Sequence, residues 1–269
     1  MSNEPGFQLS GTGPESYERY IGVYMAPFVD AVIQRAKLAP GDAVLDVACG
    51  TGFVARAASS LVGSTGRVAG LDINPGMLEV ARAASASANP SIEWHQASAE
   101  EIPFEDSTFD AVLCSQGIMF LPDLRNGVKE LCRVAAPGGR VVASFWASLE
   151  RNIFIAASIR RMEKALPEGS VSKQAFRLDR DETAAMFRDS GLQGIVAETV
   201  EEMVSLPPIA DFLPGHTASL PYAGEFEALD PAVRQRLYDE ITNDLAAYIQ
   251  GDGTLLVPFA VHMVSGIRQ

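Results

Sequence analysis

Apolar runs alternate with helical patterns along the first half of the chain. Nearly continuous apolar runs are typical of strands that are buried on both faces of a parallel sheet. Five such runs cover residues 43–49, 67–73, 92–98, 110–116 and 140–146. Helical patterns begin between them near Gly52, Pro75 and Asp123. This alternation predicts an α/β fold with helices on both faces of a mostly parallel sheet.

Helical patterns also lie on either side of this region. Residues 16–38 place apolar and aromatic side chains at helical spacing, which predicts a leading helix or pair of helices. Two more helices are predicted over residues 151–166 and 178–192. Asp179 is the expected N-cap of the second one, and Gly191 is its expected end.

The last part of the chain contains two strand patterns that are separated by a long insert. The strand patterns cover residues 195–206 and 255–267, and the insert covers residues 207–253. Its second half predicts a helix that Asp230 caps and Pro231 begins. Since ordinary connections are far shorter, we expect this insert to cover a ligand cleft, with a purely structural flap as the alternative.

The composition is that of a folded, acidic protein. Hydrophobic residues make up 47% of the chain and charged residues 20%, and the net charge is −13. Because such a chain repels a phosphate backbone, a nucleic acid is not an expected partner.

The sequence also bears on location. Residues 1–16 lack the basic and apolar regions of a signal peptide, and no apolar run is long enough to span a membrane. The three cysteines, Cys49, Cys114 and Cys132, form no C-x-x-C pair, as expected for reduced thiols. We therefore expect a cytoplasmic protein. Its expected oligomeric state is a monomer or a homodimer.

A glycine-rich segment follows the first apolar run, and it fits two nucleotide-binding patterns. Residues 43–56 read AVLDVACGTGFVAR. Gly50, Gly52 and Ala55 match the dinucleotide pattern G-x-G-x-x-A, and Asp72 follows 20 residues after Gly52. This match predicts a nicotinamide or flavin site.

Asp46 argues against a dinucleotide, because it places a negative charge inside the first strand, beside the expected pyrophosphate. A cofactor that carries an amino group and a sulfonium tolerates this charge. Here the sequence resembles the class I S-adenosylmethionine (SAM) dependent methyltransferases, whose first motif has the form V-L-D-x-x-C-G-T-G.

The resemblance continues through three further segments in the family's order. They are LDINPGMLEVAR (71–82), QASAEEIPFEDSTFDAVLCSQGIMFLPD (96–123) and LCRVAAPGGRVVASFW (131–146). In total the resemblance covers about residues 17–146. Within the family, the sequence most resembles the branch that includes ubiquinone and menaquinone biosynthesis methyltransferases and methyltransferases for small natural products.

The resemblance implies a Rossmann-like, doubly wound sheet. We expect seven mostly parallel strands with the last one antiparallel, N-terminal helices, and a helical cap inserted between the last two strands. The expected divisions are an N-terminal helical segment over the cofactor site (1–40), a SAM-binding core (41–206), the cap (207–254) and a final core strand (255–269).

SAM is the implied cofactor, and S-adenosylhomocysteine (SAH) is its product. Asp72 is implied to bind the ribose, with Ile73 and Met77 beside the adenine. Ser98 stands where many relatives have Asp, so the adenine contact is assigned to the backbone around Ala99. The full set of expected cofactor-binding residues is Asp46, Ala48, Gly50, Gly52, Asp72, Ile73, Met77, Ser98, Ala99, Ser115 and Tyr20.

Methyl transfer mainly requires an in-line approach and the exclusion of water, so it makes few side chains obligatory. His216, in the insert, is the candidate general base for a hydroxyl acceptor. Met119, Phe120 and Tyr24 are expected to form an apolar wall of the substrate pocket. No metal is expected, because Ser115 and the two residues after it lack the Asp-Asn ligands of the magnesium-dependent relatives.

The sequence thus predicts an enzyme that transfers a methyl group from SAM to O or C of a small, largely apolar molecule. Three alternatives stay open. They are a SAM-binding protein that catalyses a reaction without methylation, such as a cyclisation, an NAD-dependent oxidoreductase, and a non-catalytic partner subunit.

Overall fold

A seven-stranded sheet with the order β3-β2-β1-β4-β5-β7-β6 organises the chain. The computed structural model describes residues 7–269, so residues 1–6 of the predicted N-terminal segment lie outside it. The strands are β1 (Ala43–Val47), β2 (Arg67–Asp72), β3 (Ile92–Gln96), β4 (Phe109–Ser115), β5 (Ala135–Trp146), β6 (Leu192–Leu206) and β7 (Leu255–Arg268).

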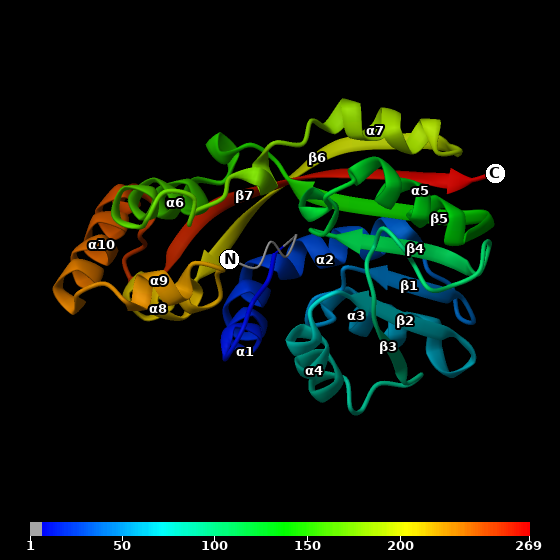
Figure 1. The fold of residues 1–269 in the computed structure, drawn as a ribbon, viewed down its shortest axis with the longest axis horizontal. Coiled ribbons are helices and arrows are strands. Elements are labelled where there is room, and N and C mark those ends of the chain that lie inside the picture. The colour runs from blue at the N-terminus through cyan, green and yellow to red at the C-terminus, as the bar shows by residue number, and fades with distance from the viewer. Residues whose placement is uncertain (1–6) are drawn as a thin grey trace.

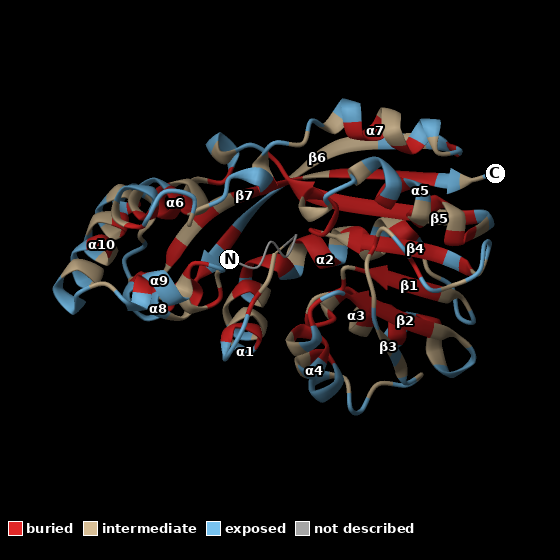
Figure 2. Cartoon of the chain, in the orientation of Figure 1, coloured by how far each residue is buried: buried red, intermediate tan, exposed pale blue. Residues whose placement is uncertain are grey.

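The direction of the strands agrees with the prediction. The strands β1 to β5 pair in parallel, whereas β7 pairs antiparallel with both β5 and β6. Buried residues are concentrated along β1, β2, β4 and β5 (Figure 2), as expected for parallel strands with helices on both faces. The predicted Rossmann-like, mostly parallel sheet with an antiparallel last strand is therefore confirmed.

The helices follow the predicted alternation. An N-terminal helical stretch consists of α1 (Gly13–Ser16), the π-helical turn η1 (Tyr17–Ile21) and α2 (Gly22–Ala36). The helices beside the sheet are α3 (Phe53–Val62), α4 (Pro75–Ala84), α5 (Leu124–Val134) and α7 (Arg180–Asp189). The remaining helices are α6 (Ile153–Ala165), α8 (Ile209–Ala218), α9 (Ala223–Glu227) and α10 (Pro231–Asp244).

The predicted helix caps form as expected. The Asp179 carboxylate accepts hydrogen bonds from two backbone amides in the first turn of α7. Asp230 accepts one from Ala232 in α10, and Pro231 begins that helix. These side-chain hydrogen bonds satisfy backbone amides that have no partner within their helix. Because the bonds join residues close together in the sequence, both helix starts could be predicted from it.

Some element boundaries were wrong. β5 begins at Ala135 rather than at residue 140, because Ala135 pairs with Phe109 ahead of a register shift in β4. The turn at Pro137 therefore lies within β5, and the preceding helix α5 ends at Val134. β6 likewise begins at Leu192, three residues before the predicted start, and continues past a second register shift.

The last two strands extend out of the main sheet toward a second group of helices. In Figure 1, β6 and β7 lead to α6, α8, α9 and α10 at the left of the view. Arg161 of α6 contacts both oxygens of Asp244 in α10, at 2.6 and 2.7 Å. The helix α6, which the sequence assigned to the core, therefore packs against the insert. The division of the chain into domains stays a prediction.

Within residues 7–269, no helix combines the length and the apolar character that crossing a bilayer requires.

Trp94 of β3 occupies the space above two glycines. A Cβ on Gly52 would lie 2.4 Å from Trp94 Cη2, and one on Gly70 would lie 2.3 Å from Trp94 Cζ3. Gly70 is the register partner of Trp94 in the neighbouring strand. Gly52 also has a φ of +86°, a conformation that side chains rarely adopt. The missing side chain at Gly52 therefore makes room for the indole rather than for a ligand.

The variant Gly52→Ala is expected to lose more stability than Gly191→Ala, its matched control. Both glycines have a positive φ, +86° and +95°, but a Cβ on Gly191 would meet no atom within 4 Å. Backbone strain costs about 1–2 kcal/mol at either site, and the overlap with Trp94 adds roughly 1–3 kcal/mol at Gly52 alone. Urea denaturation measures both, and equal losses would show that the indole gives way freely.

Candidate active site

A cavity of about 340 Å³ opens at the carboxyl ends of β1 and β4. The strand order reverses between these two strands, where open α/β sheets commonly bind ligands. The N-terminal helical stretch, the loop after α6 and the helix α8 also contribute side chains to the wall. Segments far apart in the sequence therefore enclose one space.

Most of the predicted site residues line this cavity. Those that do are Asp46, Ala48, Gly50, Asp72, Ile73, Met77, Ser98, Ala99, Ser115, Met119, Phe120, Tyr24 and His216. Two predicted cofactor residues, Gly52 and Tyr20, are not part of the wall. Gly52 lies under Trp94, and the Tyr20 ring covers Gly215 and contacts Phe212 of α8.

Tyr17 lines the cavity where the sequence placed Tyr20. Tyr17 and Tyr24 are seven residues apart and share one side of the N-terminal helical stretch, whereas Tyr20 faces α8. A spacing of seven residues is about two helical turns, so the sequence could have indicated that Tyr17 and Tyr24 share a face. The π-helical turn over Tyr17–Ile21 changes the helical phase there, which a sequence pattern does not reveal.

The Asp72 carboxylate holds the glycine-rich loop. Its Oδ2 accepts a hydrogen bond from the Gly50 amide, and its Oδ1 accepts one from the Asn74 amide, both at 2.8 Å. Gly50 has a φ of +54°, and a Cβ there would meet only Tyr17, at 3.9 Å. The loop therefore leaves an open face toward the cavity, next to a carboxylate that can accept hydrogen bonds.

Asp46 supports the first turn of α3 from the neighbouring strand. Its Oδ2 accepts a hydrogen bond from the Ala55 amide at 2.9 Å, and no side chain caps this helix at its own N-cap, Gly52. Asp46 is only 1% exposed, and burial raises the pKa of its carboxyl to about 8. The residue thus links β1 to α3 and faces the cavity as well.

The charged side chains of the wall are all acidic. They are Asp46, Asp72 and Glu100, and within residues 7–269 the wall includes no Lys or Arg. Such a wall favours a ligand with positive charge and offers nothing to neutralise a pyrophosphate. A glycine loop that is open to the cavity and carboxylates around it fit SAM, whose sulfonium and ammonium are cationic.

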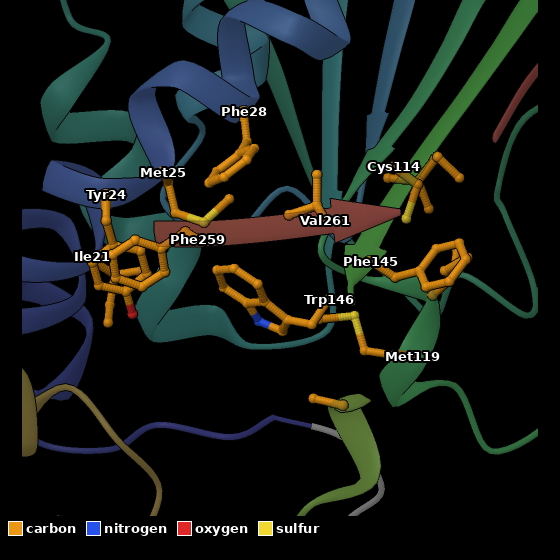
Figure 3. Packing of buried hydrophobic residues seen from close by; sticks show 14 of the residues in the cluster. Ile21, Tyr24, Met25, Phe28, Cys114, Met119, Phe145, Trp146, Phe259 and Val261 are labelled. Carbon is orange, nitrogen blue, oxygen red and sulfur yellow. The ribbon is translucent and has the colours of Figure 1, made fainter. Parts of the chain in front are cut away.

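The other half of the cavity is apolar and aromatic. Trp146 stacks on Phe176, with ring centroids 6.2 Å apart, and Tyr24 stacks on Phe259 at 4.7 Å. Figure 3 shows Trp146 between Tyr24 and Met119, at the end of β5. Nothing in the local sequence distinguishes Trp146 or Phe176 from aromatic residues of the core, so the sequence does not predict either one as a site residue.

His216 lies within this aromatic half. Its ring packs against Phe154 and Phe212, and its Nε2 lies 3.4 Å from the Tyr24 hydroxyl, within hydrogen-bonding distance. Burial lowers the pKa of His216 to about 3, so the imidazole is neutral. The chain's two other histidines, His95 and His262, are not part of the wall.

Among residues 7–269, no group of three or more His, Cys, Asp or Glu side chains is arranged to hold a metal ion.

Comparison with known proteins identifies the segment around the glycine-rich loop. Residues 44–139 match a family model described as a methyltransferase domain. This segment is therefore similar to methyltransferase domains. It contains Gly50, Asp72 and Ser98, and it ends within β5. The match bears out the resemblance to methyltransferases over this part of the chain.

Curated relatives are similar over part of the chain. An uncharacterised protein of Mycobacterium tuberculosis is 32% identical over 165 residues, which are 61% of this chain and 59% of that protein. Demethylmenaquinone methyltransferase of Staphylococcus aureus is 44% identical over 102 residues, which are 38% of this chain and 42% of that protein. The chain thus spans 59% or less of the length of these relatives.

Solved structures share the fold over nearly the whole chain. The YcgJ protein of Bacillus subtilis has a TM-score of 0.60 at 19% identity, covering 91% of this chain and 99% of its own. Phosphoethanolamine N-methyltransferase 2 of Haemonchus contortus, solved with S-adenosyl-L-methionine, has a TM-score of 0.60 at 18% identity. That likeness covers 96% of this chain and 57% of the other.

Replacing Asp46 with Asn is expected to flatten the pH dependence of stability. Its carboxyl has a pKa of about 8 when folded and one of about 4 when unfolded. Between these values the folded state binds more protons, so the free energy of unfolding falls as the pH rises. Asp46→Asn keeps an acceptor for Ala55 and removes about 1–3 kcal/mol of the fall between pH 6 and 8.

Urea denaturation at pH 6, 7 and 8 measures this difference. Asp106→Asn, which removes an exposed carboxylate, is the matched control and should leave the slope of stability against pH as in the wild type. An equally steep slope in the Asp46 variant would mean that Asp46 is already ionised in the folded protein.

Proposed function

We propose that the chain transfers the methyl group of SAM to an oxygen or carbon atom of a small, largely apolar molecule. The observation that carries this proposal is the contrast between the two halves of one cavity. Carboxylates lie around the glycine-rich loop, and uncharged side chains, many of them aromatic, form the rest of the wall. A cationic cofactor and an uncharged acceptor match these two environments.

Each part of the cofactor has a candidate partner. Asp72 would accept hydrogen bonds from the ribose hydroxyls, and Ile73 and Met77 would pack beside the adenine. Asp46 and the open face of Gly50 would receive the cationic methionine end. When bound, SAM supplies a methyl group that its sulfonium has already activated.

The chain's own contribution is to orient the acceptor and to exclude water. Tyr17 and Tyr24 of the N-terminal helical stretch and Trp146 of β5 enclose the space beside the glycine-rich loop. An acceptor held there approaches the methyl group from one direction, and this restriction supplies much of the rate increase. The quinone methyltransferase among the relatives supports an aromatic acceptor.

His216 is the proposed general base for a hydroxyl acceptor. A neutral imidazole with a pKa of about 3 does not ionise a phenol in advance. The acidity of the hydroxyl rises steeply as its oxygen bonds to the methyl carbon, so even a weak base can take the proton at that stage. The proton would then pass to a ring nitrogen of His216.

The first test is calorimetric titration of the purified protein with SAM, with NADH as the control ligand. The wild type should bind SAM, and Asp72→Asn should bind it at least about tenfold more weakly, because a charge-assisted bond to the ribose is lost. Asp106→Asn, which removes a charge outside the cavity, should bind SAM normally. Binding of NADH without SAM would favour the oxidoreductase instead.

The second test concerns the base. Phe at position 216 preserves the packing against Phe154 and Phe212 but cannot accept a proton, so turnover of a phenolic acceptor should fall about 10²- to 10⁴-fold. SAM affinity should be unchanged, and His262→Phe is the matched control. Unchanged turnover in His216→Phe would rule out His216 as the general base. A product whose mass lacks an added methyl group would favour the non-methylating alternative.

A further inference from the structure

Gln116, directly after β4, carries a buried oxygen with no partner. Its side chain is only 9% exposed, and its Nε2 donates a hydrogen bond to Ser144 Oγ at 3.3 Å. Its Oε1 has no hydrogen-bond partner among residues 7–269. A buried acceptor without a partner destabilises a fold unless a ligand supplies the donor.

The backbone at Gln116 is also unusual. Its φ is 57°, in the left-handed region that Gly or Asn adopts at lower cost. The backbone N–H of Gln116 donates a hydrogen bond to the Ser144 carbonyl oxygen, at 2.8 Å. Gly117 follows in a turn so tight that a Cβ there would lie 2.6 Å from Ala48 Cβ. The turn therefore presents one long polar side chain in a strained conformation.

This side chain belongs to the acceptor half of the cavity. Gln116 lines the cavity together with Met119 and Trp146. It is bonded to Ser144 of β5, two residues before Trp146. The wall also contains polar side chains such as Ser115, Ser158 and Gln174, but among the described residues of the wall only Gln116 has a buried side-chain oxygen without a partner. The carboxylates that match the cationic cofactor, Asp46 and Asp72, lie at the ends of the other strands β1 and β2.

We propose that Gln116 is a specificity-determining residue whose Oε1 accepts a hydrogen bond from a phenolic hydroxyl of the acceptor, a hydroxyl other than the one that His216 deprotonates. This inference rests on the proposed function and narrows it, because it selects aromatic acceptors that carry an O–H group. A site built to bond a hydroxyl rejects analogues that lack it, since its own polar group is then left unpaired. The same bond would orient the aromatic ring beside Trp146.

Matched aromatic probes test this inference without knowledge of the natural acceptor. Calorimetry in saturating SAH compares 1-naphthol, which has a hydroxyl donor, with 1-methylnaphthalene, which has none, and with 1-acetylnaphthalene, which only accepts. The wild type should bind 1-naphthol at least about tenfold more tightly than either analogue.

Two variants remove the oxygen in different ways. Gln116→Leu nearly keeps the size of the side chain. Gln116→Asn tolerates the left-handed backbone conformation and, because Asn is one methylene shorter, moves the side-chain amide away from the cavity. Both should bind 1-naphthol and 1-methylnaphthalene with equal affinity, and SAH as the wild type does. Gln193→Leu, the same change at an exposed residue outside the cavity, is the matched control and should retain the preference for 1-naphthol.

Several outcomes would overturn the inference. They are a wild type that does not distinguish the probes, one that prefers 1-acetylnaphthalene, and Gln116 variants that still prefer 1-naphthol. A loss of SAH binding in both variants would assign Gln116 to the cofactor or to the loop. Failure of the proposed function is distinct, because the wild type would then bind neither SAM nor SAH.

Discussion

The turn between β1 and α3 depends on two buried carboxylates that accept hydrogen bonds from backbone amides. Asp72, at the end of β2, accepts from Gly50, and Asp46, inside β1, accepts from Ala55 in the first turn of α3. These bonds hold a loop whose glycine has an open face toward the cavity. Without them, the amides at this helix start would have no protein partner, and the cofactor end of the cavity would lose its shape.

The same carboxylates set the electrostatic character of the site. Burial disfavours their charged form, and within residues 7–269 the wall includes no Lys or Arg that would compensate. A cationic ligand restores this balance, whereas an anionic one worsens it. The cavity is therefore matched to charge at one end, and its other end, around Trp146 and His216, is neutral because burial keeps the imidazole unprotonated.

The neutral end is built from parts of the chain that only the fold brings together. β6 and β7 continue beyond the main sheet, and α6 and α10 pack against each other beside this extension (Figure 1). Tyr24 from the N-terminal helical stretch contacts His216 from α8. Trp146, the last residue of β5, lies between Tyr24 and Met119 (Figure 3). The shape of this end of the cavity thus depends on contacts between residues nearly 200 positions apart, such as Tyr24 and His216.

The sequence by itself determined the parallel sheet of β1 to β5, the helix caps and the loop residues Gly50 and Asp72, and the antiparallel last strand followed from the family resemblance. These features depend on periodicity and on side-chain bonds within a few residues, or on a motif of fixed spacing. Only the tertiary structure decided that Tyr17 lines the cavity instead of Tyr20, that Gly52 makes room for Trp94, and that Gln116 carries an unpartnered oxygen. Each of these depends on which distant side chain fills the adjacent space, and local sequence carries no record of that packing.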